Sequence, residues 1–189
     1  SAHGRRDLAL SALLGLSVQS KYHELDILAA RISADIGESR SVLGHVKRGL
    51  EKAKKTHASP SSVASAYALK AQALLMRSGK SRVRRAHIES RRALALDRNH
   101  PDAILAAALV SEARSKYSKA ISWLQRLVAV APLQAKGHYH LGRILSMVID
   151  AENRARKPLQ TALKLDKDGI WGHKAKRVLR RLKRRSRRR

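Results

Sequence analysis

Arginine and lysine are the side chains in this sequence whose types and spacing most plainly offer chemistry. The sequence has 41 Lys and Arg against 14 Asp and Glu, a formal net charge of +27. Arginine presents planar, bidentate donors that suit phosphate and carboxylate groups. The cations gather in residues 80–92 and in the C-terminal segment. We predict that these clusters bind a polyanion through Lys80, Arg82, Arg84, Arg85, Arg91, Arg92, Lys174, Lys176, Arg177, Arg180, Arg181, Lys183, Arg184, Arg185, Arg187, Arg188 and Arg189.

Other chemical motifs are weak. Gly79-Lys80-Ser81 matches the end of a phosphate-binding loop, but Leu74 stands where that loop needs a glycine and no strand is predicted before it. His138 and His140 are two residues apart, whereas ligands on one helix face are three or four apart. The sequence has no cysteine, no nucleophile elbow and no carboxylate pair in an apolar frame. We therefore expect no metal, no cofactor and no catalysis.

The elements that position the basic clusters are predicted to be helices. Hydrophobic residues make up 43% of the sequence, yet aromatic residues make up 3% and Phe is absent, so Leu, Ala, Ile and Val must form the core. Straight-chain and small residues favour helices, while strands prefer aromatic and β-branched residues. No segment has the 18–20 or so apolar residues that a transmembrane helix needs. The sequence predicts an all-α fold.

A repeated pattern organises the middle of the chain. One unit is carried by Pro101-Asp102-Ala103-Ile104-Leu105, Ala107-Ala108, Tyr117, Ala120-Ile121, Leu124 and Val130-Ala131-Pro132. These residues resemble one tetratricopeptide repeat, a helix–turn–helix unit of 34 residues. The resemblance implies that Tyr117 opens the second helix, and Leu127 departs from the small residue that the family has at its place. The next unit has Leu141-Gly142, Ala155, Leu159, Ala162 and Leu165-Asp166, and the preceding one has Ala66, Leu69, Ala73 and the ending Ala93–Arg98.

Residues 62–167 thus resemble three tetratricopeptide repeats. The resemblance implies helix pairs stacked as a right-handed superhelical solenoid, because one pair alone cannot bury its apolar face. It also implies a concave groove lined by the first helix of each repeat. Carried over by match, the groove residues are Tyr67, Ala71, Asp102, Leu105, Lys136, Tyr139 and Arg143. The two tyrosines either contact a partner or only pack between helices.

The predicted organisation has four parts. Residues 1–58 form N-terminal helices, at 5–19, 22–35 and 40–56, or divergent repeats; Ser59-Pro60-Ser61 then starts a new helix. The repeats occupy 59–167, and residues 168–182 form a capping helix. Residues 183–189 have no apolar side chain and form a basic tail, disordered in isolation. Because Pro158 is disfavoured inside a helix, the last repeat's second helix either kinks or starts late, with Pro158 in its first turn, and we expect the late start.

These features favour a non-enzymatic interaction scaffold. Its groove would hold a protein partner with an acidic segment, and its basic surface would bind RNA or another nucleic acid through backbone contacts, in a larger assembly. One alternative is an adaptor for an acidic protein without nucleic acid. Another is an exported or membrane-apposed assembly factor, since Arg5-Arg6 and the apolar run after it resemble a twin-arginine signal. We favour an ordinary first helix and a location in the cytoplasm, the nucleus or an organelle interior; the tail also fits a nuclear localisation signal.

Overall fold

The computed structural model describes residue 15 and residues 22–77, 79–148 and 152–186. These residues form helices and no strands, so the predicted all-α fold is confirmed. The chain divides into two compact units, Ser1–Val110 and Ser111–Arg189. The helix predicted at 5–19 lies outside the described residues, apart from Gly15.

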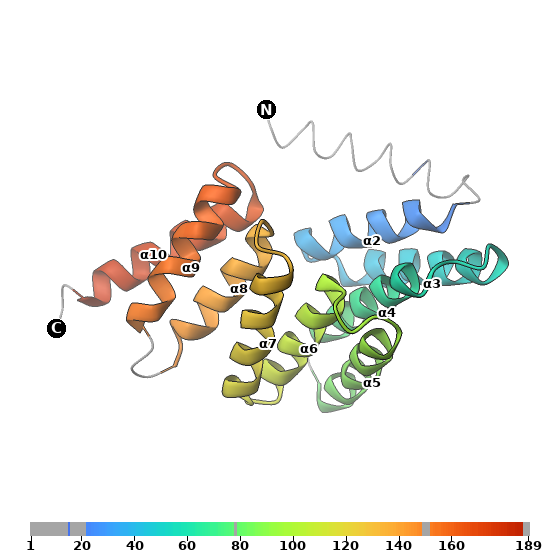
Figure 1. Ribbon diagram of the computed structural model, residues 1–189, viewed down its shortest axis with the longest axis horizontal. Helices are drawn as coiled ribbons and strands as arrows, with labels where there is room; N and C mark the ends of the chain where they lie inside the picture. Colours follow the sequence, from blue (N-terminus) through green and yellow to red (C-terminus); the bar gives the residue numbers. More distant parts are fainter. Residues whose placement is uncertain (1–14, 16–21, 78, 149–151, 187–189) are drawn as a thin grey trace. The chain divides into compact units, whose positions relative to one another are not determined.

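The first unit contains α2 (His23–Ile36), α3 (Ser39–Lys55), α4 (Pro60–Leu75), α5 (Lys80–Leu96) and the first ten residues of α6 (Pro101–Ala113). Successive helices pair as hairpins, α2 with α3 and α4 with α5 (Figure 1). The hairpins also stack, because α4 packs on both α2 and α3. This order of contacts is that of a helical repeat, in which each pair covers the apolar face of the next.

Local sequence signals set several helix ends in this unit. Ser59 caps α4, since its hydroxyl accepts a hydrogen bond from the Ser62 amide, and Pro60 occupies the first turn. Gly37 ends α2 in the left-handed conformation, with φ of 93°. Gly79-Lys80-Ser81 is the start of α5, with Gly79 at φ of 128°. The helix start predicted at Ser59-Pro60-Ser61 is confirmed.

Small side chains fill the interior of the first unit. One apolar cluster joins Leu69 of α4 to α2 and α3, through Ile27, Ala30, Ala34, Val42, Val46, Ala66, Leu69 and Ala73. A second joins α4, α5 and α6 through Ala68, Ala71, Leu74, Ala86, Ala93, Ala103, Ala106 and Val110. Alanine lets helix backbones approach closely, so the unit buries its core without aromatic residues.

Two buried carboxylates tie the helices of the first unit together. Asp102, on α6, accepts hydrogen bonds from Arg31 Nη2 on α2 and from Ser65 Oγ on α4, both at 2.8 Å. Asp26, on α2, accepts from Arg48 Nε at 3.1 Å and Lys52 Nζ at 2.7 Å, both on α3. A buried charge is tolerated only when it is paired, so these contacts fix which helices meet.

The second unit contains α7 (Tyr117–Val130), α8 (Ala135–Leu145), α9 (Glu152–Leu165) and α10 (Ile170–Ser186). Here α8 packs on α7, α9 and α10, and α10 also packs on α9 (Figure 1). Leu127 is fully buried, and an added Cβ at Gly137 would lie 3.1 Å from its Cγ. A glycine on α8 thus accommodates a leucine where the repeat usually has a small residue.

The expected late start of α9 is wrong. The helix begins at Glu152 and contains Pro158 in its interior. Ala155, Leu159 and Ala162 are all fully buried on one face of this helix. Ala155 lies before the proline, so burying it on α8 requires the helix to begin earlier, and this packing offsets the lost backbone hydrogen bond.

The last helix extends further than predicted. We expected it to end at Leu182, but α10 continues through Lys183, Arg184 and Arg185 to Ser186. Lysine and arginine are good helix formers, and cations in the last turn favour the negative end of the helix dipole. At the other end Asp166 caps the helix, with Oδ2 accepting a 2.8 Å hydrogen bond from the Trp171 amide. Residues 187–189 of the predicted tail lie outside the described residues.

Two glycine positions offer a matched test of this packing. At Gly142 an added Cβ would lie 2.5 Å from Leu159 Cγ and 3.1 Å from the carbonyl oxygen of Ala155. We therefore expect Gly142→Ala to lower the free energy of unfolding by about 1–3 kcal/mol through overpacking. Urea unfolding followed by far-UV circular dichroism measures it.

The control is Gly44→Ala in α3. Its Cβ would meet only Arg48 Nη1 at 3.9 Å. Since alanine is the better helix former, this variant should gain about 0.5–1 kcal/mol. A Gly142→Ala protein as stable as the Gly44→Ala protein would contradict the close α8–α9 packing.

Candidate interaction surfaces

A cluster of aromatic rings and ammonium groups joins α8 to α10. The centroid of the Trp171 ring lies 5.3 Å from that of Tyr139 and 5.4 Å from that of His140. Lys174 Nζ lies 4.2 Å from the Trp171 centroid, and Lys136 Nζ lies 5.3 Å from it. We call these five residues the α8/α10 cluster. Tyr139, Trp171 and Lys174 are half-buried, so part of the cluster faces solvent.

The cluster is electrostatically positive. Burial lowers the pKa of His140 well below its usual value, and the charges of Arg143, Lys136 and Lys174 lower it further. His140 is therefore neutral at pH 7. Its Nδ1 atom is buried and finds no hydrogen-bond partner among the described residues. A site that holds two ammonium groups beside a neutral ring is suited to a carboxylate or another anion.

Arg143 lies on the same helix but is engaged within the protein. Its Nη1 and Nη2 donate hydrogen bonds of 2.7 and 2.5 Å to the two carboxylate oxygens of Glu112. This bidentate pair raises the pKa of Arg143 although burial opposes the shift. Its guanidinium already has a carboxylate, so a partner would have to displace Glu112 to use it.

The groove residues predicted in the first unit have mixed surroundings. Ala71 and Leu105 have no exposed surface, and Asp102 is buried and bound by Arg31, so all three contribute to packing. Tyr67 is half-buried, and Arg92 lies over its ring at 5.9 Å from the centroid. Of the predicted groove residues, the structure therefore places Lys136, which is buried, and Tyr139, which is half-buried, in the α8/α10 cluster, and three of the first-unit members in the core.

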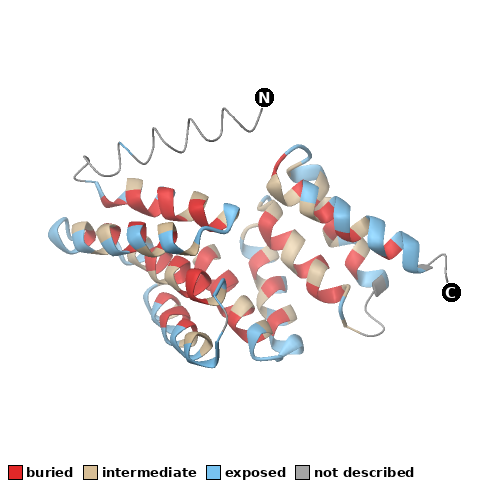
Figure 2. Ribbon diagram, turned by 180° about the vertical axis from the view of Figure 1, so that it is seen from behind, coloured by how far each residue is buried: buried red, intermediate tan, exposed pale blue. Residues whose placement is uncertain are grey.

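Apart from His173, the exposed residues described on α10 are lysines and arginines. Ala175, Val178 and Leu182 form its buried stripe, and Figure 2 shows this helix, next to the C-terminus, red on one side and pale blue on the other. The helix contains no Asp or Glu. Five exposed cations form no ion pair with any described carboxylate: Lys176, Arg177, Arg180, Arg181 and Arg184. We call these five residues the α10 basic face.

The basic residues predicted on α5 divide into two groups. Lys80, Arg84, Arg85 and Arg91 are exposed, whereas Arg82 is half-buried. Arg92 pairs with Glu89 at 3.3 Å, and Glu89 also accepts Lys70 at 3.0 Å. The α5 cluster is thus partly neutralised inside its own unit, unlike the α10 basic face.

His138 is engaged within its own chain, since its Nε2–H donates a 2.8 Å hydrogen bond to the carbonyl oxygen of Pro132. The described residues contain no group of three His, Cys, Asp or Glu side chains placed to share a metal ion. Among the described helices, none combines the length and the apolar character required to cross a membrane.

Sequence reasoning missed the central ring of the α8/α10 cluster. Trp171 is not among the predicted site residues, and Lys174 is predicted only as part of the polyanion-binding set. The structure joins both to the groove residues Lys136 and Tyr139. The available signal was the position of Trp171, early in the helix that follows the last repeat, where it can reach the first helix of that repeat.

Known proteins resemble this chain only distantly. No family model and no curated protein matches it. Among solved structures, one titled "Crystal structure of MamA protein" is 20% identical, with 88% of this chain and 85% of that chain covered and a TM-score of 0.48. "Crystal structure of MamA" is 21% identical, with 87% and 90% covered and a TM-score of 0.49. "MamA RS-1 ArsTM double mutant" is 18% identical, with 87% and 86% covered and a TM-score of 0.49.

The fold defines the class of protein. In the first unit α2 pairs with α3, α4 pairs with α5, and the two hairpins stack; in the second unit α8 pairs with α9, α7 packs on α8, and α10 packs on both α8 and α9. This is the arrangement of a tetratricopeptide-like helical repeat.

The neutral state of His140 predicts a pH dependence of stability. Its pKa is lower in the folded protein than in the unfolded chain, where it is about 6.5. As the pH falls through that value, the unfolded chain takes up a proton that the folded protein does not. Stability is therefore lost toward acid, by up to about 1.4 kcal/mol per pH unit from this group.

The measurement is urea unfolding at pH 7.5 and 5.5 for the native sequence and for His140→Phe, which keeps a ring but cannot titrate. The variant should lose less stability between the two pH values. His45, whose pKa is lowered by burial and by Arg48, contributes equally to both proteins. Identical losses in the two proteins would contradict a buried, neutral His140.

Proposed function

We propose that this protein is a non-enzymatic interaction scaffold that binds an acidic segment of a protein partner at the α8/α10 cluster. The observation that supports this most directly is the pair of ammonium groups, Lys136 and Lys174, held over the Trp171 ring. Both come from helices that pack on each other, so their spacing is fixed by the fold.

A carboxylate suits this place for two reasons. It would neutralise the positive charge of Lys136 and Lys174, which lowers the pKa of His140 in addition to the larger effect of burial. Ion pairs next to partly buried aromatic surface are also less screened by water than those on an open surface. The cluster is thus a place where an anionic group gains more than elsewhere on this basic protein.

The aromatic rings would supply the second part of the recognition. Tyr139 and Trp171 lie in contact and are half-buried, so each presents ring surface beside the ammonium groups. Aromatic anchors with a nearby cation are common in the centre of protein interfaces. A fitting partner segment carries Asp or Glu next to an apolar residue, in a stretch long enough to lie along both helices.

Trp171 provides a direct readout of this proposal. Trp123→Phe leaves Trp171 as the remaining tryptophan of the two in the sequence. When a 12-residue peptide of Asp, Glu and Leu is titrated into this variant, the fluorescence of Trp171 should change and reach saturation. In that background Lys174→Gln should weaken binding about tenfold, as expected for loss of one charged hydrogen bond.

The matched control is Lys176→Gln, which removes the same charge from the other side of α10, where Lys176 is exposed. It should change the dissociation constant by less than about twofold, because exposed charges contribute little individually. Equal losses in the two variants would mean that the peptide follows net charge, and would contradict a specific α8/α10 site.

A second candidate function is binding of a nucleic-acid backbone by the α10 basic face. It is favoured by five exposed cations on one helix, with no described carboxylate to neutralise them. Arginine is suited to phosphate, and the face presents no aromatic ring, so contact would follow the backbone and ignore base sequence.

This candidate predicts a specific salt dependence. If four arginines each neutralise one phosphate of a single-stranded oligonucleotide, replacing Arg177, Arg180, Arg181 and Arg184 with Gln should reduce the slope of log K against log[salt] by about 3. Fluorescence anisotropy of a labelled random oligonucleotide between 50 and 300 mM salt measures it.

The control removes four exposed cations of the same unit that lie off this face: Arg154, Lys157, Lys164 and Lys167, each to Gln. Its slope should stay near that of the native sequence. If both sets reduce the slope equally, the binding is a property of total charge and the α10 basic face has no special role.

A further inference from the structure

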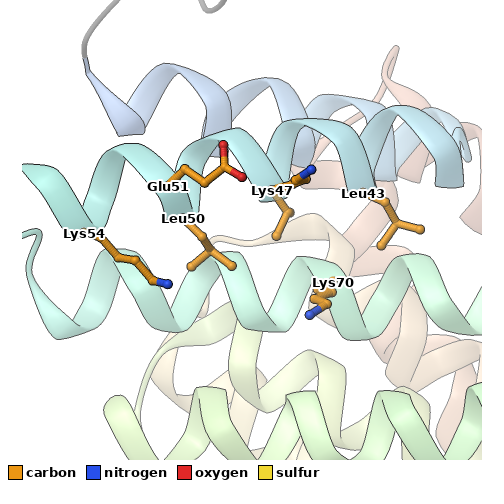
Figure 3. A pocket seen from close by; sticks show the side chains of 7 residues that line it. Leu43, Lys47, Leu50, Glu51, Lys54 and Lys70 are labelled. Carbon is orange, nitrogen blue, oxygen red and sulfur yellow. The ribbon is translucent and has the colours of Figure 1, made fainter.

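A hollow of about 350 Å³ lies between α3 and α4 in the first unit. Its lining is Leu43, Val46, Lys47, Leu50, Glu51 and Lys54 from α3, with Lys70 from α4. Figure 3 shows the α3 side chains in a row along one helix and Lys70 on the neighbouring helix. Val46 is buried in the floor, while Leu43 and Leu50 are half-buried and reach the opening. We call this feature the α3/α4 groove.

The order of residues along α3 gives the groove a pattern. Leu43, Lys47, Leu50 and Lys54 are spaced by four, three and four residues, which places them on one face of the helix. Apolar and cationic side chains therefore alternate along the opening. The stripe spans about 16 Å at 1.5 Å per residue. This is the length of roughly three turns of a partner helix.

The charges of the rim favour an anionic occupant. Lys47 and Lys54 are exposed, and neither forms an ion pair with a described carboxylate. Lys70 is held by Glu89 of α5 at 3.0 Å, so its charge is largely matched within the unit. Glu51 is the one acidic residue among those that line the hollow. It lies between the two exposed lysines and limits how much negative charge the groove accepts.

We propose that the α3/α4 groove binds an acidic amphipathic helix of a protein partner. The partner's apolar residues would contact Leu43 and Leu50, and its Asp or Glu residues would meet Lys47 and Lys54. A helix that docks in a groove contributes its own anchors at i, i+3 or i+4, and i+7. Two apolar residues of the partner seven positions apart would match the spacing of Leu43 and Leu50. The groove belongs to the first unit and the α8/α10 cluster to the second, so this proposal does not depend on the proposed function.

The probe is a labelled 14-residue helical peptide, with Leu at two positions seven residues apart and Glu between and after them. Fluorescence anisotropy should show saturable binding. A scrambled peptide of equal charge should bind about tenfold more weakly, because the apolar anchors no longer align. Equal binding of the two peptides would overturn the proposal.

Two variants of equal charge locate the site. The double variant Lys47→Glu, Lys54→Glu should bind the peptide about tenfold more weakly than the native sequence does. Arg40→Glu with Lys55→Glu makes the same change of charge on exposed positions of α3 that do not line the groove, and should leave affinity within about twofold. Equal effects of the two pairs would contradict the assignment.

A gain of affinity tests the same site without relying on damage. Glu51→Gln removes the carboxylate from the rim at an exposed position and should tighten the acidic peptide about threefold. An unchanged or weaker affinity would overturn the proposal. Two other occupants are tested as competitors: vesicles of anionic lipid, and a second copy of this chain detected by light scattering. The proposal would also be overturned if either one displaced the peptide and if Leu50→Asn abolished the binding of that competitor without affecting the binding of the peptide.

Discussion

The scarcity of carboxylates is the constraint on which this structure depends. The 14 acidic residues face 41 lysines and arginines, and several of the acidic ones are used where helices meet. Asp26 joins α3 to α2, and Asp102 joins α2 and α4 to α6. Glu89 holds Lys70, and Glu112 holds Arg143. A carboxylate held in a buried ion pair cannot neutralise the surface, and the five cations of the α10 basic face form no ion pair with a described carboxylate.

This division of charge links the fold to what the protein can bind. Alanine and leucine allow close helix packing, and close packing requires the few polar groups inside to be paired. The α10 basic face, the α8/α10 cluster and the α3/α4 groove then differ in what accompanies their positive charge. The first has charge alone, the second has aromatic rings, and the third has aliphatic side chains. Such differences give a basic protein a way to choose among anionic partners.

The sequence predicted the helices well because their apolar spacing and end signals are local. Ser59 and Pro60 define the start of α4 without reference to the rest of the chain. The prediction for Pro158 was wrong because a tertiary contact, the burial of Ala155, outweighs the local cost of proline. The C-terminal helix was underestimated because Lys183 to Arg185 have no apolar residue, yet helix propensity and the helix dipole extend it.

The candidate sites were harder to predict, because they depend on which helices come together. Repeat positions alone placed Tyr139 and Lys136 in a groove, but could not show Trp171 between them and Lys174. Repeat positions also could not show that Asp102 accepts a hydrogen bond from Arg31, or that Leu43 and Leu50 line a hollow beside α4. Each of these contacts joins residues far apart in sequence, which a local pattern does not encode.

Recognition of an acidic protein segment at a particular place on this basic protein can be measured directly. The measurement is a titration of the ¹⁵N-labelled protein with the acidic 12-residue peptide, followed by amide and indole NMR shifts at 150 mM salt. Binding at the α8/α10 cluster predicts saturable shifts concentrated at Tyr139, Trp171 and their neighbours on α8 and α10. Small, non-saturating shifts spread evenly over every exposed lysine and arginine would contradict it.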